Sequence, residues 1–138
     1  MTLSDAEIDA RLATAVAVIR EAGDLALDYF RRREALAVEF KGPQDVVSKA
    51  DQEVERLIRD RLAAAFPDDG CVGEEHGAAG DAARSWVIDP IDGTQNFLRG
   101  IPYWTVVLAF VVDGRTVLGL TLDPVHGELF TARRGHGA

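Results

Sequence analysis

Residues 86–97 read Trp-Val-Ile-Asp-Pro-Ile-Asp-Gly-Thr-Gln-Asn-Phe, a stretch that joins a short apolar run to two aspartates. The apolar run at 86–88 predicts a strand that delivers Asp89 at its end. The proline that follows restricts the backbone, and Asp92 comes three residues after the first aspartate. The segment therefore predicts two carboxylates held on a rigid turn at the end of a strand.

Gly93 and Thr94 follow the second aspartate and suit the start of a helix, where backbone N–H groups can bind an anion. Hard cations such as Mg²⁺ prefer oxygen ligands and usually share them with substrate phosphates. Two carboxylates beside these amides would therefore suit a divalent cation and a phosphate together. A competing interpretation is that Asp-Pro and Asp-Gly are ordinary turn-forming pairs. The alternating acidic positions of a calcium-binding EF-hand loop are absent.

Two further acidic segments lie upstream of this stretch. Residues 73–77 read Gly-Glu-Glu-His-Gly after a short apolar run, and residues 45–51 read Asp-Val-Val-Ser-Lys-Ala-Asp. Paired glutamates are commonly a solvated turn, and His76 alone would be a surface histidine. Asp51 would lie in the first turn of a helix, where the helix dipole favours a carboxylate without further function. Two strand ends that offer carboxylates nevertheless satisfy the requirement of a site for several metal ions.

Two helices are predicted in the first half of the chain. Ser4 and Glu7 form a capping box for a first helix that runs to about residues 30–33. A second helix is expected over roughly residues 49–66, with Ser48 as its N-cap. The positions expected on the inner face of this second helix are Val54, Leu57, Ile58, Arg61, Leu62 and Ala65.

Strands are predicted from the changed character of the remaining sequence. Residues 36–40 alternate weakly and are expected to form a strand, followed by a turn at 41–45. Two helices followed by a mainly antiparallel meander predict an α+β fold, with the helices packed on the sheet. The other expected strands are 71–73, 86–88, 104–112, 115–122 and 128–132, with Asp113-Gly114 as a hairpin turn.

The composition limits the possible functions. The chain has 138 residues, about one domain or slightly less, and a net charge of −8. This charge argues against a non-specific nucleic-acid binder, which needs a basic face. Because there is no long apolar run, no recognisable secretory signal and only one cysteine, we expect a cytoplasmic protein without nucleic-acid or membrane partners. Such an acidic chain repels phosphate substrates unless positive charge lies at the site.

The three acidic elements, in this order, resemble the inositol monophosphatase family of Mg²⁺-dependent, lithium-sensitive phosphatases. The family signature is an apolar strand, then Asp-Pro-Ile/Leu-Asp-Gly-Thr, about two variable positions and an aromatic residue. Residues 86–97 match this signature without a gap. A Gly-Glu-Glu element of the family matches residues 73–75, and an Asp-x-Val-Thr/Ser-x-Ala-Asp element matches residues 45–51. The resemblance covers nearly the whole chain.

The resemblance implies a set of ligands for two or three Mg²⁺ ions. Glu74, Asp89 and the backbone carbonyl of Ile91 would bind a first ion. Asp89 and Asp92 would bind a second ion. Glu74 or Glu75 would help to hold a third ion more loosely.

The resemblance also implies a mechanism and a substrate class. Thr94 and Asp51 would polarise the attacking water, with the hydroxyl relaying to the carboxylate. The amides of Gly93 and Thr94, beside Asp92, would hold the phosphate, and Lys41 matches a family lysine near the metals. The implied reaction is direct hydrolysis of a small phosphate monoester, such as an inositol monophosphate, by metal-activated water without a phosphoenzyme.

The family fold is a layered αβαβα sandwich with two halves, and residues 1–138 resemble the N-terminal half only. The second half supplies another metal-ligating aspartate and most contacts to the alcohol, and we expect it to be absent here. A metal-binding half without turnover is therefore one alternative to an active phosphatase. Sheet surface exposed at 104–122 would then favour a homodimer or other self-association.

Three other interpretations stay open at this stage. Arg99 in Asn-Phe-Leu-Arg-Gly resembles some bacterial relatives assigned to histidinol phosphate, which is an alternative substrate. A haloacid-dehalogenase-type phosphatase also carries Asp-Gly-Thr, but its motif needs one residue between the two aspartates, whereas two separate Asp89 from Asp92. A purely structural domain with a solvated acidic surface would bind no Mg²⁺ through these aspartates.

Overall fold

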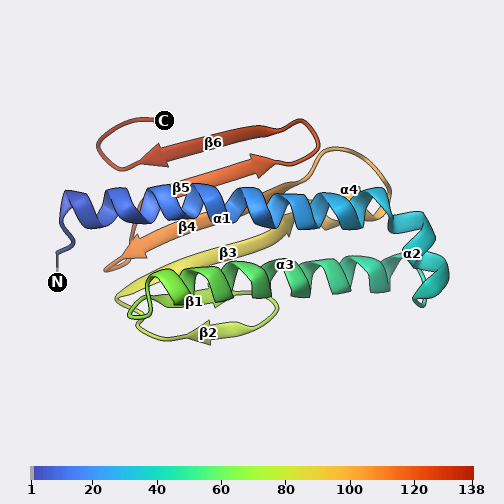
Figure 1. The fold of residues 1–138 in the computed structure, drawn as a ribbon, viewed down its shortest axis with the longest axis horizontal. Coiled ribbons are helices and arrows are strands. Elements are labelled where there is room, and N and C mark those ends of the chain that lie inside the picture. The colour runs from blue at the N-terminus through green and yellow to red at the C-terminus, as the bar shows by residue number, and fades with distance from the viewer. Residues whose placement is uncertain (1) are drawn as a thin grey trace.

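Two long helices lie side by side over one face of a six-stranded sheet in the computed structural model, which describes residues 2–138 (Figure 1). Helix α1 packs on strands β4 and β5, and helix α3 packs on β3. This arrangement confirms the predicted α+β fold of helices on a mainly antiparallel sheet. The elements are α1 Asp5–Arg31, α2 Arg33–Glu39, α3 Pro43–Ala65, β1 Gly70–Gly73, β2 Gly77–Ala79, β3 Arg84–Asp92, α4 Thr94–Leu98, β4 Thr105–Val112, β5 Arg115–Asp123 and β6 Glu128–Arg133.

The sheet has the strand order β2-β1-β3-β4-β5-β6. Every neighbouring pair is antiparallel except β1 and β3, which are parallel and place Gly73 opposite Ile88. The short strand β2, which was not predicted, and the loop at 80–83 return the chain so that this parallel pair can form. Strands β1 and β3 consequently end at the same edge of the sheet.

The core lies between the helices and the inner face of the sheet. The predicted capping box at Ser4 and Glu7 is present and begins α1. A Cβ atom on Gly23 would lie 2.4 Å from Leu122 Cδ2, so this glycine lets α1 approach β5 closely. Phe30, at the end of α1, packs against Phe97 with a ring-centroid distance of 5.3 Å. This packing fixes the short helix α4, which follows the candidate site, to the core.

The segment between the two long helices differs from the prediction. Residues 36–40, expected as a strand, belong mostly to helix α2. Only Leu36 is buried in α2, whereas Val38 is 88% exposed, so the weak alternation does not correspond to a sheet face. A strand here would also need a partner for its backbone groups, whereas a helix satisfies them internally.

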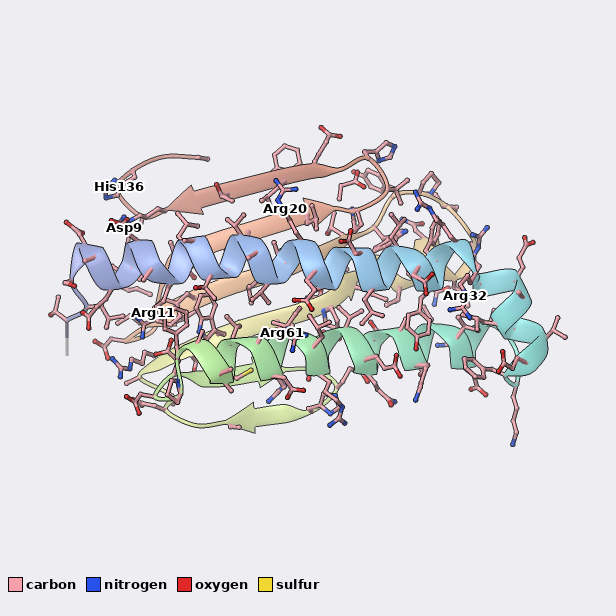
Figure 2. All side chains as sticks on the ribbon, viewed as in Figure 1. Asp9, Arg11, Arg20, Arg32, Arg61 and His136 are labelled. Atoms are coloured by element: carbon pink, nitrogen blue, oxygen red, sulfur yellow. The ribbon has the colours of Figure 1, made fainter. Side chains whose placement is uncertain are left out.

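Helix α3 begins at Pro43, six residues before the predicted start at Lys49. Proline is favoured at the first helical position, and Gly42 supplies the left-handed backbone, with a φ of 102°, before it. The predicted inner face is confirmed at Val54, Leu57, Ile58 and Leu62, which are buried or partly buried, whereas Arg61 and Ala65 are exposed. Arg61 instead reaches Glu21 of α1, with 2.8 Å between its Nη2 and the carboxylate Oε1 (Figure 2).

A buried charge network joins α1 to the beginning of β1. Arg11 donates two hydrogen bonds of 2.8 Å to the Asp69 carboxylate (Figure 2). Trp86 Nε1 donates a third hydrogen bond of 3.1 Å, and Arg84 Nε lies 3.4 Å away. The Arg11 guanidinium also lies 4.5 Å from the ring centroid of Phe66. Within residues 2–138, no helix has both the length and the apolar character needed to cross a membrane.

Candidate metal and phosphate site

The parallel pairing of β1 and β3 brings two of the predicted acidic segments together. Gly73 is opposite Ile88 in this parallel pair. The next residue along each segment, Glu74 after β1 and Asp89 in β3, therefore comes to the same end of the sheet. Glu74 and Glu75 lie in the exposed turn that connects β1 to β2. Sequence alone predicted two strand ends with carboxylates but not the parallel register that makes them neighbours.

Asp89 and Asp92 are separated by an irregularity in β3. Asp89 is opposite Val107 and Asp92 is opposite Thr105, so three steps along β3 match only two along β4. Such a bulge bends the strand and redirects the side chains on either side of it. Asp89 is half-buried and Asp92 is exposed at the last position of the strand, while the Ile91 side chain is buried.

The predicted helix start at Gly93 and Thr94 is confirmed by helix α4. Gly93 has a φ of 98°, which favours glycine, and a Cβ atom there would lie 3.2 Å from the Tyr103 carbonyl oxygen. The first N–H groups of a helix have no intrahelical acceptor, so the amides here can serve another group. Thr94 is half-buried, and none of the hydrogen bonds within residues 2–138 joins its hydroxyl to Asp51.

Asp51 lies on α3 close enough to the strand-end carboxylates to interact with their charges. Because α3 begins at Pro43, Asp51 is in the interior of the helix rather than its first turn, and the helix dipole does not explain it. Burial, followed by the negative charges of Glu75 and Asp89, raises the pKa of Asp51 to about 7. The residue is only 9% exposed.

Asp89 has a similar electrostatic environment. Burial, followed by the charges of Asp92 and Glu74, raises the pKa of Asp89 to about 6, although a hydrogen bond from the Ile91 backbone opposes this rise. Asp89 thus lies among carboxylates that repel its charge, and the predicted ligands offer oxygen donors only. This donor set fits hard cations such as Mg²⁺, which prefer carboxylate and carbonyl oxygens.

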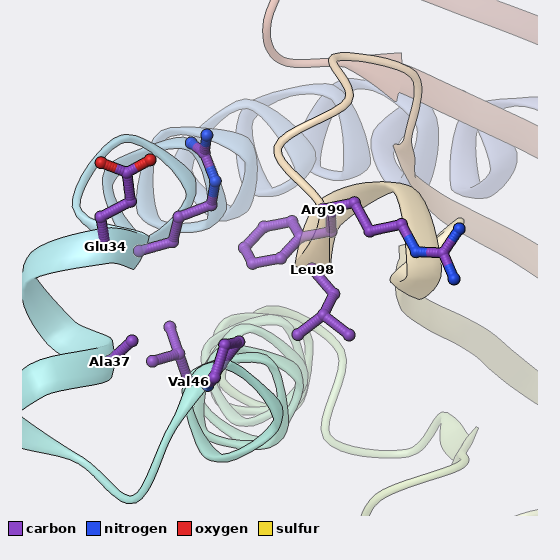
Figure 3. A pocket seen from close by; sticks show the side chains of 8 residues that line it. Glu34, Ala37, Val46, Leu98 and Arg99 are labelled. Atoms are coloured by element: carbon purple, nitrogen blue, oxygen red, sulfur yellow. The ribbon is translucent and has the colours of Figure 1, made fainter.

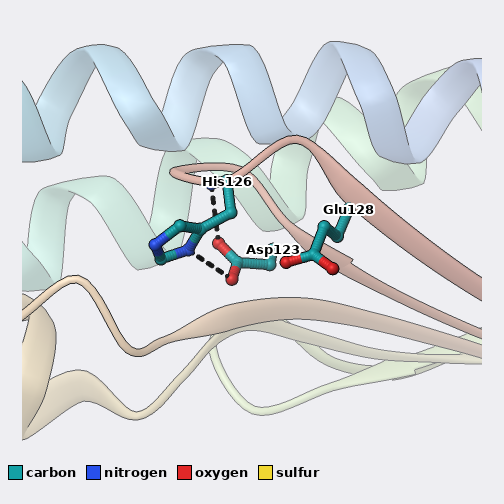
Figure 4. Close-up of side chains that lie close together, drawn as sticks. All are labelled: Asp123, His126 and Glu128. Atoms are coloured by element: carbon teal, nitrogen blue, oxygen red, sulfur yellow. Dashed lines mark hydrogen bonds and ion pairs between the residues drawn. The ribbon is translucent and has the colours of Figure 1, made fainter.

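The predicted ligands do not form the most compact acidic group of the chain. Within residues 2–138, only Asp123, His126 and Glu128 place their potential ligand atoms within 4.8 Å of one another (Figure 4). Asp123 accepts a hydrogen bond of 3.1 Å from the His126 backbone and lies 2.7 Å from His126 Nδ1. Glu128 is opposite Asp123 in the β5–β6 register. The closeness of this group is explained by the hairpin turn that it caps.

Sequence reasoning missed Glu55, a residue of α3 that is 0% exposed. Its carboxylate accepts hydrogen bonds from the backbone N–H groups of Glu75 and His76, at 3.1 and 2.8 Å. Arg59 donates to the same carboxylate at 3.1 Å. The signal in the sequence is the four-residue spacing of Asp51, Glu55 and Arg59, which follows the apolar stripe of the helix.

Lys41 lies in the turn that precedes α3. It is exposed there, beside a pocket that Phe40, Asp45 and Lys49 also line. A separate cavity of about 300 Å³ lies between α2, α3 and α4 (Figure 3). Its lining includes Val46 and Arg99 and none of the predicted metal or phosphate residues.

Curated proteins of known name are similar to this chain. A histidinol-phosphatase from Chlorobaculum parvum is 44% identical over 128 residues, which make up 92% of this chain and 49% of that protein. A Nus factor SuhB from Xylella fastidiosa is 42% identical over 123 residues, which make up 89% of this chain and 45% of that protein.

Solved structures show the same fold. The crystal structure of the extragenic suppressor protein suhB from Bartonella henselae has a TM-score of 0.79 and 34% sequence identity, and the match covers 91% of this chain and 49% of that one. This chain spans about half the length of the curated relatives it matches. The inositol monophosphatase family matches residues 7–138. On this match, the chain belongs to the inositol monophosphatase family.

Proposed function

We propose that residues 1–138 are the metal- and phosphate-binding half of a Mg²⁺-dependent phosphatase that hydrolyses a small phosphate monoester. One observation carries this proposal: Glu74, Asp89 and Asp51 come from three different elements to one end of the sheet. Burial, followed by the negative charges of neighbouring carboxylates, raises the pKa values of Asp51 and Asp89. Strongly perturbed carboxylates from separate elements are typical of functional sites.

The carboxylates are proposed to hold two or three Mg²⁺ ions. Glu74, Asp89 and the Ile91 carbonyl would bind the first ion, Asp89 and Asp92 the second, and Glu75 would assist with a looser third. When bound, Mg²⁺ makes water more acidic and supplies the positive charge that an acidic site needs to accept phosphate. This charge resolves the repulsion expected from a net charge of −8.

Asp51 and Thr94 are proposed to handle the proton of the attacking water. Asp51 is a buried carboxylate on α3 that would accept the proton, and the Thr94 hydroxyl would relay it. The water oxygen forms a bond to phosphorus, the ester P–O bond breaks, and the alcohol leaves with a proton. The amides of Gly93 and Thr94, beside Asp92, would hold the phosphate oxygens during this displacement.

The proposed substrate is an inositol monophosphate or a compound like it. Histidinol phosphate is the alternative, and two observations favour it: the name of the Chlorobaculum parvum relative and the presence of Arg99 after Asn-Phe-Leu. The proposed partner is thus a small phosphorylated metabolite in the cytoplasm, without nucleic acid or membrane.

Self-association of the chain is also proposed. The face of the sheet turned away from the helices carries Val72, Val87 and Phe130, which are 40%, 41% and 61% exposed. Exposed apolar surface of this kind favours association, which would produce a homodimer or a larger assembly. A light-scattering mass above that of one 15.0 kDa chain would support this proposal, and a well-behaved monomer would contradict it.

The test of the function is phosphate release from inositol 1-phosphate and from histidinol phosphate, with and without Mg²⁺ and Li⁺. We expect release that requires Mg²⁺, is inhibited by Li⁺ and is lost in the Asp89→Asn variant. Asp24→Asn, which neutralises an exposed carboxylate on α1, is the matched control and should behave like the wild type. Release without added metal, or release that Asp89→Asn leaves unchanged, would contradict the proposed function. Mg²⁺ binding without release would assign the chain to the alternative of a metal-binding half without turnover.

A further inference from the structure

We propose that Glu55 is a positioning residue whose buried carboxylate fixes the turn that carries Glu74 and Glu75. This inference rests on the proposed function in one respect, because the consequence of a fixed turn is a defined Mg²⁺ affinity. Glu55 itself would touch neither the metal nor the substrate. It would act through the backbone of the turn, at the point where α3 meets the end of β1.

Each oxygen of the Glu55 carboxylate has its own backbone donor in the turn. The Glu75 N–H donates to Oε1 at 3.1 Å, and the His76 N–H donates to Oε2 at 2.8 Å. Hydrogen bonds to a charged acceptor are roughly twice as strong as those between neutral groups. Two adjacent amides held by one carboxylate restrict the orientation of the peptide units next to Glu74. A turn that is otherwise exposed to solvent is therefore tied to a buried side chain.

Arg59 completes the attachment and offsets the buried negative charge. Its Nε atom donates to Glu55 Oε2 at 3.1 Å, and its Nη2 atom donates to the Gly77 carbonyl oxygen. One guanidinium thus neutralises the carboxylate and holds the far end of the turn. A buried charge without such a partner would be strongly destabilising, so the two residues form one unit.

The glycine before Glu74 reflects the same contact. A Cβ atom on Gly73 would lie 2.2 Å from Glu55 Oε1 and 2.3 Å from its Cδ. The carboxylate therefore occupies the space that any larger residue at this position would need. The Gly-Glu-Glu sequence has a physical explanation here, because the glycine makes room for the group that holds the two glutamates.

The contacts of Glu55 separate its role from that of an ordinary buried ion pair. Asp69 is also paired with an arginine, and its side chain is 1% exposed, but within residues 2–138 its carboxylate accepts hydrogen bonds only from side chains. Asp69 lies before the first residue of β1, whereas Glu55 contacts the turn after the last. Loss of either carboxylate should destabilise the fold, but only loss of Glu55 should change the metal site.

The experiment compares the wild-type chain with Glu55→Gln and with Asp69→Asn as the matched control. Glutamine keeps the volume of the side chain but replaces one acceptor oxygen with an NH₂ group. This NH₂ group cannot accept the hydrogen bond of the second backbone amide. NMR hydrogen exchange reports on the Glu75 and His76 amides, and Mn²⁺ affinity measured by electron paramagnetic resonance reports on the site. In Glu55→Gln we expect exchange of these amides to speed up about tenfold or more and Mn²⁺ affinity to fall about 10- to 100-fold. Asp69→Asn should leave the Mn²⁺ affinity of the folded chain within about twofold of the wild type.

A second variant keeps the test decisive if Glu55→Gln does not fold. Glu55→Asp retains the negative charge that pairs with Arg59, but its side chain is one methylene shorter and cannot reach both amides. It should therefore show the same faster amide exchange and the same fall in Mn²⁺ affinity. Unchanged amide exchange and Mn²⁺ affinity in the variants that fold would overturn the positioning role. A wild-type chain that binds no Mn²⁺ would contradict the proposed function, and the amide exchange would then decide the role of Glu55 by itself.

Discussion

The two ends of strand β1 place carboxylates in opposite electrostatic environments. Before its first residue, Asp69 accepts two hydrogen bonds from Arg11 and one from Trp86. Near the residue after its last, burial and then the negative charges of other carboxylates raise the pKa values of Asp51 and Asp89 to about 7 and about 6. At the first end the negative charge of Asp69 is paired with an arginine, whereas at the second end the carboxylates repel one another.

This difference indicates which end serves stability and which serves function. A carboxylate paired with arginine gains nothing from an added cation. A group of carboxylates that repel one another is stabilised by any cation that binds among them. Proteins commonly keep such destabilising arrangements only at functional sites. The comparison therefore predicts opposite consequences when a carboxylate is neutralised at one end or the other.

The largest change in stability is expected for Asp69→Asn. The substitution leaves the buried Arg11 guanidinium without its charged partner, and breaking a buried pair in this way costs about 3–5 kcal/mol. Urea unfolding monitored by tryptophan fluorescence measures the loss. A loss below about 1 kcal/mol, the value typical of an exposed pair, would show that this end of the sheet does not depend on the network.

Asp89→Asn should have the opposite pattern. We expect a fall in Mg²⁺ affinity of about 100-fold or more, because loss of a partner outside the ligand shell already costs 10- to 100-fold. Without Mg²⁺ at pH 7.5, the variant should be at least as stable as the wild type, because one repulsive charge has been removed. Isothermal titration calorimetry measures the Mg²⁺ affinity, and urea unfolding measures the stability. A destabilised variant with normal Mg²⁺ affinity would contradict the assignment of this end of β1 to function rather than to stability.

The metal-free chain should become less stable as the pH rises from 5 to 8. Because the folded-state pKa values of Asp51 and Asp89 lie above the unfolded value of about 3.9, the folded state retains protons that the unfolded state has lost. Stability is then lost as the pH passes through the folded values, by about 4 kcal/mol for unscreened groups and by less once solvent screens the half-buried Asp89. Urea midpoints at several pH values test this, and Asp51→Asn should remove most of the slope. A flat or rising profile would contradict the raised pKa values that burial and the neighbouring carboxylates give Asp51 and Asp89.

The smallest effect is expected for Gly73→Ala. The new methyl group would press on the Glu55 carboxylate, and overpacking of this kind typically costs about 1–3 kcal/mol. Gly119→Ala on β5 is the matched control, because a Cβ atom there would meet nothing within 4 Å. Gly73→Ala should therefore have a lower melting temperature than Gly119→Ala. Equal melting temperatures would indicate that the Glu55 side chain moves aside from the added methyl group at little cost.

Local sequence patterns predicted the elements of this chain better than the contacts between them. The strand ending near Asp89 and the hairpin turn at Asp113-Gly114 were recoverable, because apolar runs and turn residues act over a few positions. The parallel pairing of β1 and β3 depends on residues about 15 positions apart and leaves no local pattern. The three-residue strand β2, made of one glycine and two alanines, also lacks any alternation.

The candidate site was predicted in its residues but not in its surroundings. Asp89 and Asp92 stood out because two acidic residues follow an apolar strand across a proline. Asp51 was open to explanation as an acid at a helix start, and only the earlier beginning of α3 removes that explanation. Glu55 was missed because a glutamate within a helix is ordinary in sequence, and its burial depends on where the turn after β1 folds back.

The most direct test of the central claim is the effect of Mg²⁺ on the urea midpoint at pH 7.5. A ligand that binds only the folded state at 100 times its dissociation constant adds about 2.7 kcal/mol to the free energy of unfolding. We predict such a Mg²⁺-dependent gain for the wild type and for Asp24→Asn, and a gain of at most about 0.4 kcal/mol for Asp89→Asn, whose affinity should be about 100-fold lower. A wild-type midpoint that Mg²⁺ does not move, or an equal gain in Asp89→Asn, would contradict a metal site at the ends of β1 and β3.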